Sequence, residues 1–169
     1  MLYKDCSCKK IFSRSEKRSG YKLFNNGNYY ICEVKIDSGL ISEGRKCDWL
    51  YEVYKPCDRR VANSMVHCIN DDSCKNLKKS DDRQGVLKEI IFIELKGEKV
   101  KEAVDQIEQT YKFLKKNHPH LAAKNRRAYI VSTCCPSKSS ELDKMKRELK
   151  TKTGIILDRL KTIAEIKVA

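Results

Sequence analysis

The sequence predicts an α/β protein with a mixed central β-sheet flanked by helices. Runs rich in β-branched and aromatic residues alternate with segments of helical periodicity, in the order β-β-β-α-β-α-β. The chain of 169 residues contains no internal repeat and no low-complexity linker. We therefore expect residues 1–169 to form a single domain, with residues 1–28 as a polar N-terminal arm and residues 54–86 as an insertion.

The first half of the chain predicts two strands. Residues 1–28 are polar and basic, and their one weak pattern is that of a short helix near Ile11–Lys17. The first strand is expected over Tyr29–Asp37, where apolar and charged side chains alternate. Turn residues separate it from a second strand over Lys46–Val53. We expect these two strands to be antiparallel neighbours.

The insertion at 54–86 lacks the apolar pattern of a packed segment, apart from one short helix expected around Arg59–Ile69. A structureless loop of this length is unusual inside a compact domain, so we expect an anchor. Structural zinc is one candidate, and its possible ligands are Cys6, Cys8, Cys57, His67, Cys68 and Cys74. Because the nine cysteines include no Cys-x-x-Cys pair, reduced cysteines without metal are the favoured expectation.

The second half of the chain has stronger periodicity. Leu87–Leu95 is a dense apolar run, typical of a buried strand. Apolar residues then repeat at helical spacing from Val100 to Lys116, which predicts the longest helix. The remaining expected elements are a strand at Arg127–Thr133, a helix from Ser139 to Lys150, a strand at Gly154–Leu157 and a short strand or tail at Ile163–Val168.

The end of the Leu87–Leu95 strand carries two charges that a buried strand does not need. Because residues i and i+2 of a strand point to the same face, Glu94 and Lys96 should lie side by side. A carboxylate can hold a divalent cation, and an ammonium can orient water or offset developing charge. Asp48, near the start of an earlier strand, supplies a second acid. The alternative is a Glu–Lys pair that only stabilises the rim of the sheet.

An Asp on one strand, an E-x-K on a later strand and a Gln on the next helix resemble the PD-(D/E)xK nuclease superfamily, over roughly residues 29–133. The resemblance implies a restriction-endonuclease-like core, with the insertion between the Asp strand and the E-x-K strand. It gives site roles to five residues: Asp48 and Glu94 as ligands of Mg²⁺ or Mn²⁺, the Leu95 carbonyl as a third ligand, Lys96 beside the attacking water, and Gln106 orienting Lys96 or a phosphate. The sequence departs from the family at Cys47, where many members have proline, and in the long segment between the two acids.

Members of this superfamily often add a further acid, and three residues are candidates for it here. Glu33 lies on the polar face of an expected strand, and Glu16 belongs to the N-terminal arm. Asp37 precedes a Ser-Gly pair and suits a turn equally well. A surface salt bridge is the alternative for Glu16 and Glu33, and a solvated helix position is the alternative for Gln106.

The charge balance indicates the class of partner. The chain has 36 Lys and Arg against 23 Asp and Glu, a formal net charge of +13. This excess favours nucleic acid as the partner. No segment approaches the ~18 apolar residues of a membrane span, and the N-terminus lacks the apolar region of a signal peptide. We therefore expect no membrane partner and a cytoplasmic location, while the oligomeric state is left open.

The sequence thus predicts a Mg²⁺-dependent nuclease that cleaves phosphodiester bonds of DNA, as an endodeoxyribonuclease. One alternative is a non-catalytic nucleic-acid-binding module of the same fold, with or without stabilising zinc. Another is a small protein-interaction domain whose charge only keeps it soluble. The intact set of Asp48, Glu94 and Lys96 favours the enzyme, since a degenerate relative would usually have lost at least one of these charges.

Overall fold

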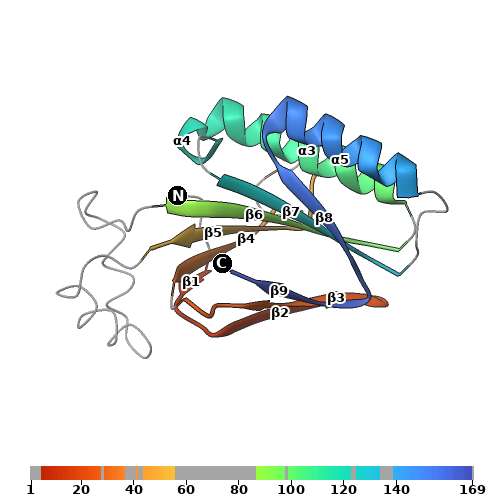
Figure 1. The fold of residues 1–169 in the computed structure, drawn as a ribbon. Coiled ribbons are helices and arrows are strands. Elements are labelled where there is room, and N and C mark those ends of the chain that lie inside the picture. Colours follow the sequence, from red (N-terminus) through yellow and green to blue (C-terminus); the bar gives the residue numbers. More distant parts are fainter. Residues whose placement is uncertain are drawn as a thin grey trace.

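The computed structural model describes residues 5–27, 29–36, 41, 44–55, 87–97, 99–122, 125–133 and 139–168. These residues form three layers: helices, a six-stranded sheet and a three-stranded sheet (Figure 1). The strands are β1 Asp5–Ser7, β2 Ile11–Glu16, β3 Ser19–Phe24, β4 Tyr30–Lys35, β5 Trp49–Tyr54, β6 Leu87–Lys96, β7 Asn125–Ser132, β8 Ile156–Lys161 and β9 Ile163–Lys167. The helices are α3 Val100–Asn117, α4 Pro119–Ala122 and α5 Ser139–Thr153. The helix expected at Arg59–Ile69 lies outside the described residues.

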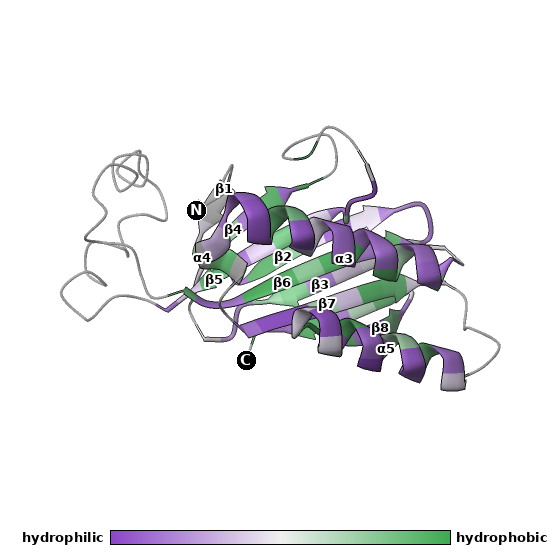
Figure 2. Cartoon of the chain, turned by 90° about the horizontal axis from the view of Figure 1, so that it is seen from above, coloured by the Kyte–Doolittle hydropathy of each residue, from purple (hydrophilic) through white to green (hydrophobic). Residues whose placement is uncertain are grey.

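The six-stranded sheet is mixed and has the strand order β1-β4-β5-β6-β7-β8. Strands β4, β5 and β6 are antiparallel neighbours, whereas β6, β7 and β8 run parallel. Parallel neighbours need a crossover connection, and α3 and α5 provide the two crossovers. Both helices lie on the same face of the sheet, with their polar sides turned outward (Figure 2). The expected α/β class with a mixed central sheet is therefore confirmed, with helices on one face of this sheet and the three-stranded sheet on the other.

Strand β6 lies inside the sheet and is buried on both faces. Its Ile90 and Phe92 belong to the apolar core under the helices, while Ile91 and Ile93 belong to a second core against the three-stranded sheet. A strand covered on both faces needs apolar residues at successive positions rather than at alternate ones. This explains the unbroken apolar run seen in the sequence.

The three-stranded sheet corrects the expectation of a polar arm at residues 1–28. The short helix expected near Ile11–Lys17 is wrong, because this segment forms β2 and pairs with β3. Phe12, Tyr21 and Leu23 are buried against the central sheet. The chain end at Ile163–Lys167 is strand β9, which runs parallel to β3 and completes this layer.

Candidate active site

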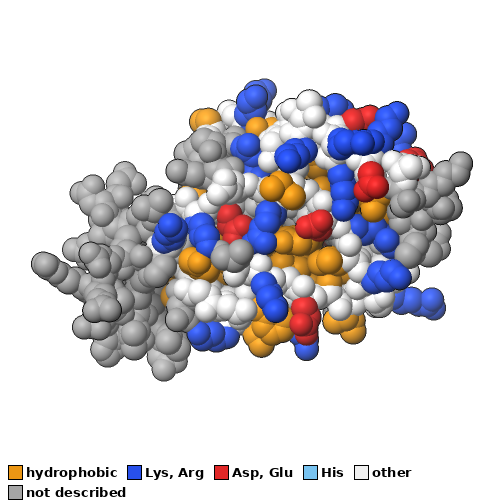
Figure 3. All heavy atoms as spheres, viewed as in Figure 1, with side chains coloured by type: hydrophobic (Ala, Val, Ile, Leu, Met, Phe, Trp, Pro, Cys, Tyr) orange, Lys and Arg blue, Asp and Glu red, His pale blue; other side chains and the backbone are white. Residues whose placement is uncertain are grey.

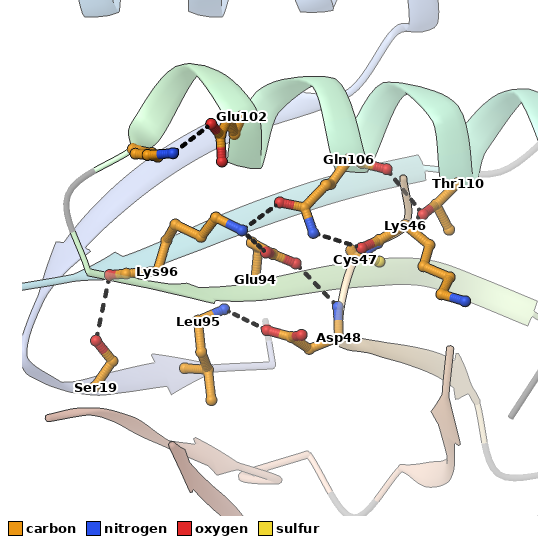
Figure 4. Close-up of polar contacts among 11 residues, drawn as sticks. Ser19, Lys46, Cys47, Asp48, Glu94, Leu95, Lys96, Glu102, Gln106 and Thr110 are labelled. Atoms are coloured by element: carbon orange, nitrogen blue, oxygen red, sulfur yellow. Dashed lines mark hydrogen bonds and ion pairs between the residues drawn. The ribbon is translucent and has the colours of Figure 1, made fainter. Parts of the chain in front are cut away.

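The antiparallel pairing of β5 with β6 brings Asp48 beside Glu94. Trp49 pairs with Ile93, so the residue before β5 meets the carboxyl end of β6. The Asp48 backbone N–H donates to Glu94 Oε2 at 3.0 Å, and the Leu95 N–H donates to Asp48 Oδ2 at 2.7 Å (Figure 4). The two acids therefore extend the contact between these strands beyond their last backbone pair.

Lys96 and Glu94 point to the same face of β6, as their spacing predicts. Lys96 Nζ lies 3.4 Å from Glu94 Oε1, and it donates to Gln106 Oε1 at 2.7 Å (Figure 4). Gln106 lies in the second turn of α3, and its Nε2 donates to the Lys46 carbonyl at 2.7 Å. Asp48, Glu94, Lys96 and Gln106 thus form one connected set, although they come from three parts of the chain.

Helix α3 also fixes the segment that leads into β5. The Cys47 N–H donates to Thr110 Oγ1 at 2.9 Å, one helical turn beyond Gln106. Thr110 Oγ1 in turn donates to the Gln106 carbonyl at 2.9 Å. Two side chains of α3 therefore hold the backbone at residues 46 and 47, and this fixes the approach of Asp48 to β6.

Glu94 is an acid of this set with a strongly shifted pKa. Its side chain is only 1% exposed. Burial raises the pKa of Glu94 to about 8, and the nearby Asp48 charge adds to this rise, while Lys96 opposes it. A carboxyl with a pKa near neutrality changes charge easily when its surroundings change, and such groups are enriched at functional sites.

The oxygen atoms at this point suit a hard divalent cation. Asp48 and Glu94 offer carboxylate oxygens, the ligand type that Mg²⁺ and Mn²⁺ prefer. The N–H and C=O of a strand residue point to the same side, so the Leu95 carbonyl faces the β5 side together with the N–H bound to Asp48. Among the residues that the structure describes, no group of three or more His, Cys, Asp and Glu is placed to hold a metal. Mg²⁺ often has only one or two carboxylate ligands and keeps water or substrate oxygens at its other positions.

The three candidates for a further acid have different positions. Glu16 lines the same pocket as Asp48 and Glu94. Glu33 lies on β4 of the central sheet, on the face toward the three-stranded sheet, where its carboxylate binds Arg14 and the Tyr51 hydroxyl. Asp37 lies outside the described residues. Of the two described candidates, only Glu16 therefore shares the pocket.

The set opens into a pocket of about 600 Å³. Its walls come from the turn between β2 and β3, the end of β6 and the start of α3. The residues of its lining that were not expected from the sequence include Lys17, Arg18, Lys99 and Thr133. The three cations belong to a chain with 36 Lys and Arg, so composition could not distinguish them. The one sequence signal near this turn is in β3, where the buried Tyr21 and Leu23 lie on either side of the exposed Lys22.

The described cysteines divide into two states. Cys32 is disulfide-bonded, which corrects the expectation that the cysteines are all reduced. Cys47 is a buried thiol, and burial raises its pKa, so it stays neutral and is unsuited to nucleophilic attack. Cys57, His67, Cys68 and Cys74, which carried the zinc hypothesis, lie outside the described residues.

In comparisons with family models, curated proteins and solved structures, nothing matches this chain. What the site can do therefore rests on its own geometry.

Of the helices that the structure describes, none combines the length and the apolar character needed to cross a membrane.

Proposed function

We propose that the protein is a metal-dependent nuclease that cleaves DNA, with a site of the PD-(D/E)xK kind. One observation carries this proposal. Asp48 and Glu94 are in direct contact, and Lys96 reaches Glu94 from the same face of β6. The order Asp, then Glu-x-Lys, then a helix Gln is the order of that superfamily, and all four side chains meet beside one pocket.

The residues have distinct tasks in this proposal. Asp48, Glu94 and the Leu95 carbonyl would hold Mg²⁺ or Mn²⁺. The bound ion would polarise the scissile phosphate and lower the pKa of a water molecule. Lys96 lines the pocket beside both acids, so its ammonium can orient the attacking water or offset charge on the phosphate. Gln106 holds the lysine ammonium in place from α3.

The surface charge supports a polyanionic substrate. The net charge is +13, and Lys and Arg side chains are spread over the face of the molecule seen in Figure 3. A surface of this kind attracts DNA through its phosphates, whatever the base sequence. The fold and the charge alone would suit a binding module equally well, so it is the acid–acid–lysine set that favours cleavage.

The experiment is a cleavage assay with purified protein and plasmid DNA. We expect nicking or cutting with Mg²⁺ or Mn²⁺ and none with EDTA. Asp48→Ala and Lys96→Ala should each lower the rate by roughly 100-fold or more. Lys112→Ala, which removes an exposed lysine of α3 that pairs with Glu108, is the matched control and should cleave as the wild type does.

Two outcomes would count against this proposal. Wild-type rates in folded Asp48→Ala or Lys96→Ala protein would show that the site is elsewhere. Tight DNA binding without cleavage under any divalent cation would favour the non-catalytic binding module instead.

A further inference from the structure

The turn between β2 and β3 has an unusual sequence for its geometry. Glu16 pairs with Ser19, which leaves Lys17 and Arg18 as a two-residue turn. Lys17 has φ +52°, in the left-handed region. Two-residue hairpin turns with positive φ normally use Gly or Asn, because other residues pay a steric cost there. The chain therefore keeps a lysine where folding alone would favour glycine.

This turn is held next to the candidate active site. Lys17 and Arg18 line the same pocket as Asp48, Glu94 and Lys96. Ser19, the next residue, donates a hydrogen bond from Oγ to the Lys96 carbonyl at 3.3 Å (Figure 4). The position of the turn is thus fixed relative to the end of β6.

The cations around the pocket fall into two groups. Lys96 pairs with Glu94, and Lys99 pairs with Glu102 at 3.0 Å. Lys17 and Arg18 are exposed, and within the described part of the chain neither side chain makes a hydrogen bond or an ion pair. Two cations without partners, beside a pocket that contains two acids of the site, can accept a ligand that is itself anionic.

We propose that Lys17 and Arg18 bind the DNA phosphate backbone next to the phosphate that is cleaved, which rests on the nuclease function proposed above. Arg can hold a phosphate through two parallel N–H bonds, and Lys can hold one as a point charge. Contacts of this type fix the register of DNA on a protein without reading its sequence. Lys17 and Arg18 would therefore act as positioning residues, with Asp48 and Lys96 at the reacting phosphate.

The first test measures binding without cleavage. Fluorescence anisotropy in EDTA, with duplex and single-stranded DNA in separate arms, gives the affinity at several salt concentrations. Lys17→Ala and Arg18→Ala should each weaken binding about 5- to 10-fold at 0.1 M salt and lower the slope of the log–log salt plot by about 1. Lys22→Ala is the matched control, since Lys22 is exposed on β3 between the inward-facing Tyr21 and Leu23. Equal affinity in all three variants would overturn the proposal.

The second test separates the side chain from the strain of its backbone. Lys17→Gly should raise Tm by roughly 2 to 3 °C, because it relieves the left-handed residue, and should still weaken DNA binding. Thr162→Gly is its counterpart, because Thr162 also has positive φ, +40°, and lies outside the pocket. It should raise Tm without any change in affinity. A Lys17→Gly protein with a higher Tm and wild-type affinity would show that the lysine has no role in binding.

These tests also separate this inference from the nuclease proposal. If the wild type cleaves DNA but the turn variants bind and cleave as it does, the turn assignment fails and the nuclease stands. If binding depends on Lys17 and Arg18 but no divalent cation supports cleavage, the turn assignment stands and the nuclease fails.

Discussion

The central sheet buries carboxylates on both of its faces, and the two faces supply them with different partners. On the face toward the three-stranded sheet, Glu33 binds Arg14 and Tyr51, and Glu89 binds Arg127 through two N–H groups at 2.7 and 2.9 Å. On the helix face, Glu94 has a lysine at 3.4 Å and a second acid as neighbours.

This difference separates an acid that holds the fold together from one that is available for chemistry. An Arg–carboxylate fork neutralises the acid and satisfies both of its oxygens. Glu94 is neutralised less completely than Glu89. Its Lys96 is shared with Gln106, and the nearby Asp48 adds negative charge. A divalent cation bound to the two carboxylates would supply the positive charge that Glu94 lacks in direct contact.

The largest expected effect is on cleavage, when the two kinds of acid are compared on the same strand. Glu94→Gln should lower the DNA cleavage rate by about 100-fold or more, because it removes a charged metal ligand. Glu89→Gln, on the opposite face of β6, should leave the rate of the folded protein within about twofold. Metal-dependent cleavage assays on both variants, with circular dichroism as the check of folding, provide the measurement. Equal losses of cleavage rate in Glu94→Gln and Glu89→Gln would show that the two acids do not differ in function.

The pH dependence of stability should also distinguish Glu94. Its pKa is about 8 in the folded protein against 4.5 as the ordinary value, so between these values the folded protein keeps a proton that the unfolded chain has released. The free energy of unfolding should therefore fall as the pH rises from about 4.5 to about 8. Glu94→Gln removes this loss, which could reach about 4 kcal/mol above pH 8.

Urea unfolding in EDTA at pH 5 and pH 8.5 measures this effect, with Glu89→Gln as the control. The stability of Glu94→Gln relative to the wild type should increase with pH. A constant difference between the two pH values would mean that Glu94 is already ionised at low pH in the folded protein.

Arg127 and Lys96, the cations beside Glu89 and Glu94, should differ in how much they stabilise the folded protein. Arg127→Met leaves Glu89 buried without its fork and should lower the free energy of unfolding by about 3 kcal/mol. Lys96→Met should cost less than about 1 kcal/mol at pH 7, because Glu94 is then mostly protonated. Urea unfolding at pH 7 compares the two. A larger loss for Lys96→Met would show that Glu94 depends on its lysine as Glu89 depends on its arginine.

A smaller effect than that of Arg127→Met is expected at the tyrosine pair behind Glu33. The Tyr51 hydroxyl donates to Glu33 Oε1 and lies 2.7 Å from the Tyr21 hydroxyl. Tyr51→Phe should lower the free energy of unfolding by about 1 to 2 kcal/mol, because it leaves a buried hydroxyl and a carboxylate each short of one partner. The cleavage rate should not change. Thermal unfolding and the plasmid assay together test this prediction.

Strong periodicity made much of the central layer predictable. The buried run at Leu87–Leu95 and the helical repeat from Val100 correspond to β6 and α3, because both elements bury apolar residues at regular positions. The pairing of Asp48 with Glu94 could not be read from local pattern. It depends on the register of β5 on β6, which is set by packing between segments distant in the sequence.

The three-stranded sheet was the part of the fold that the sequence pattern did not predict. Strand β2 buries only Phe12 among its six residues, so alternation is almost absent from it. Its turn contains Lys17 and Arg18 in place of the Gly or Asn that would have marked a hairpin. Because Lys17 and Arg18 occupy the turn, the sequence lacks the usual hairpin signal, and the same two residues place two cations at the pocket.

The side chains of Asp48 and Glu94 accept hydrogen bonds from backbone amides as well as lining the pocket. The amide proton of Leu95 is therefore bound to one site carboxylate, and that of Asp48 to the other. In an NMR spectrum of the isotope-labelled protein, these two signals would shift when the carboxylates bind a cation. The site thus contains two built-in reporters, each of which follows one acid without a label at the reacting atoms.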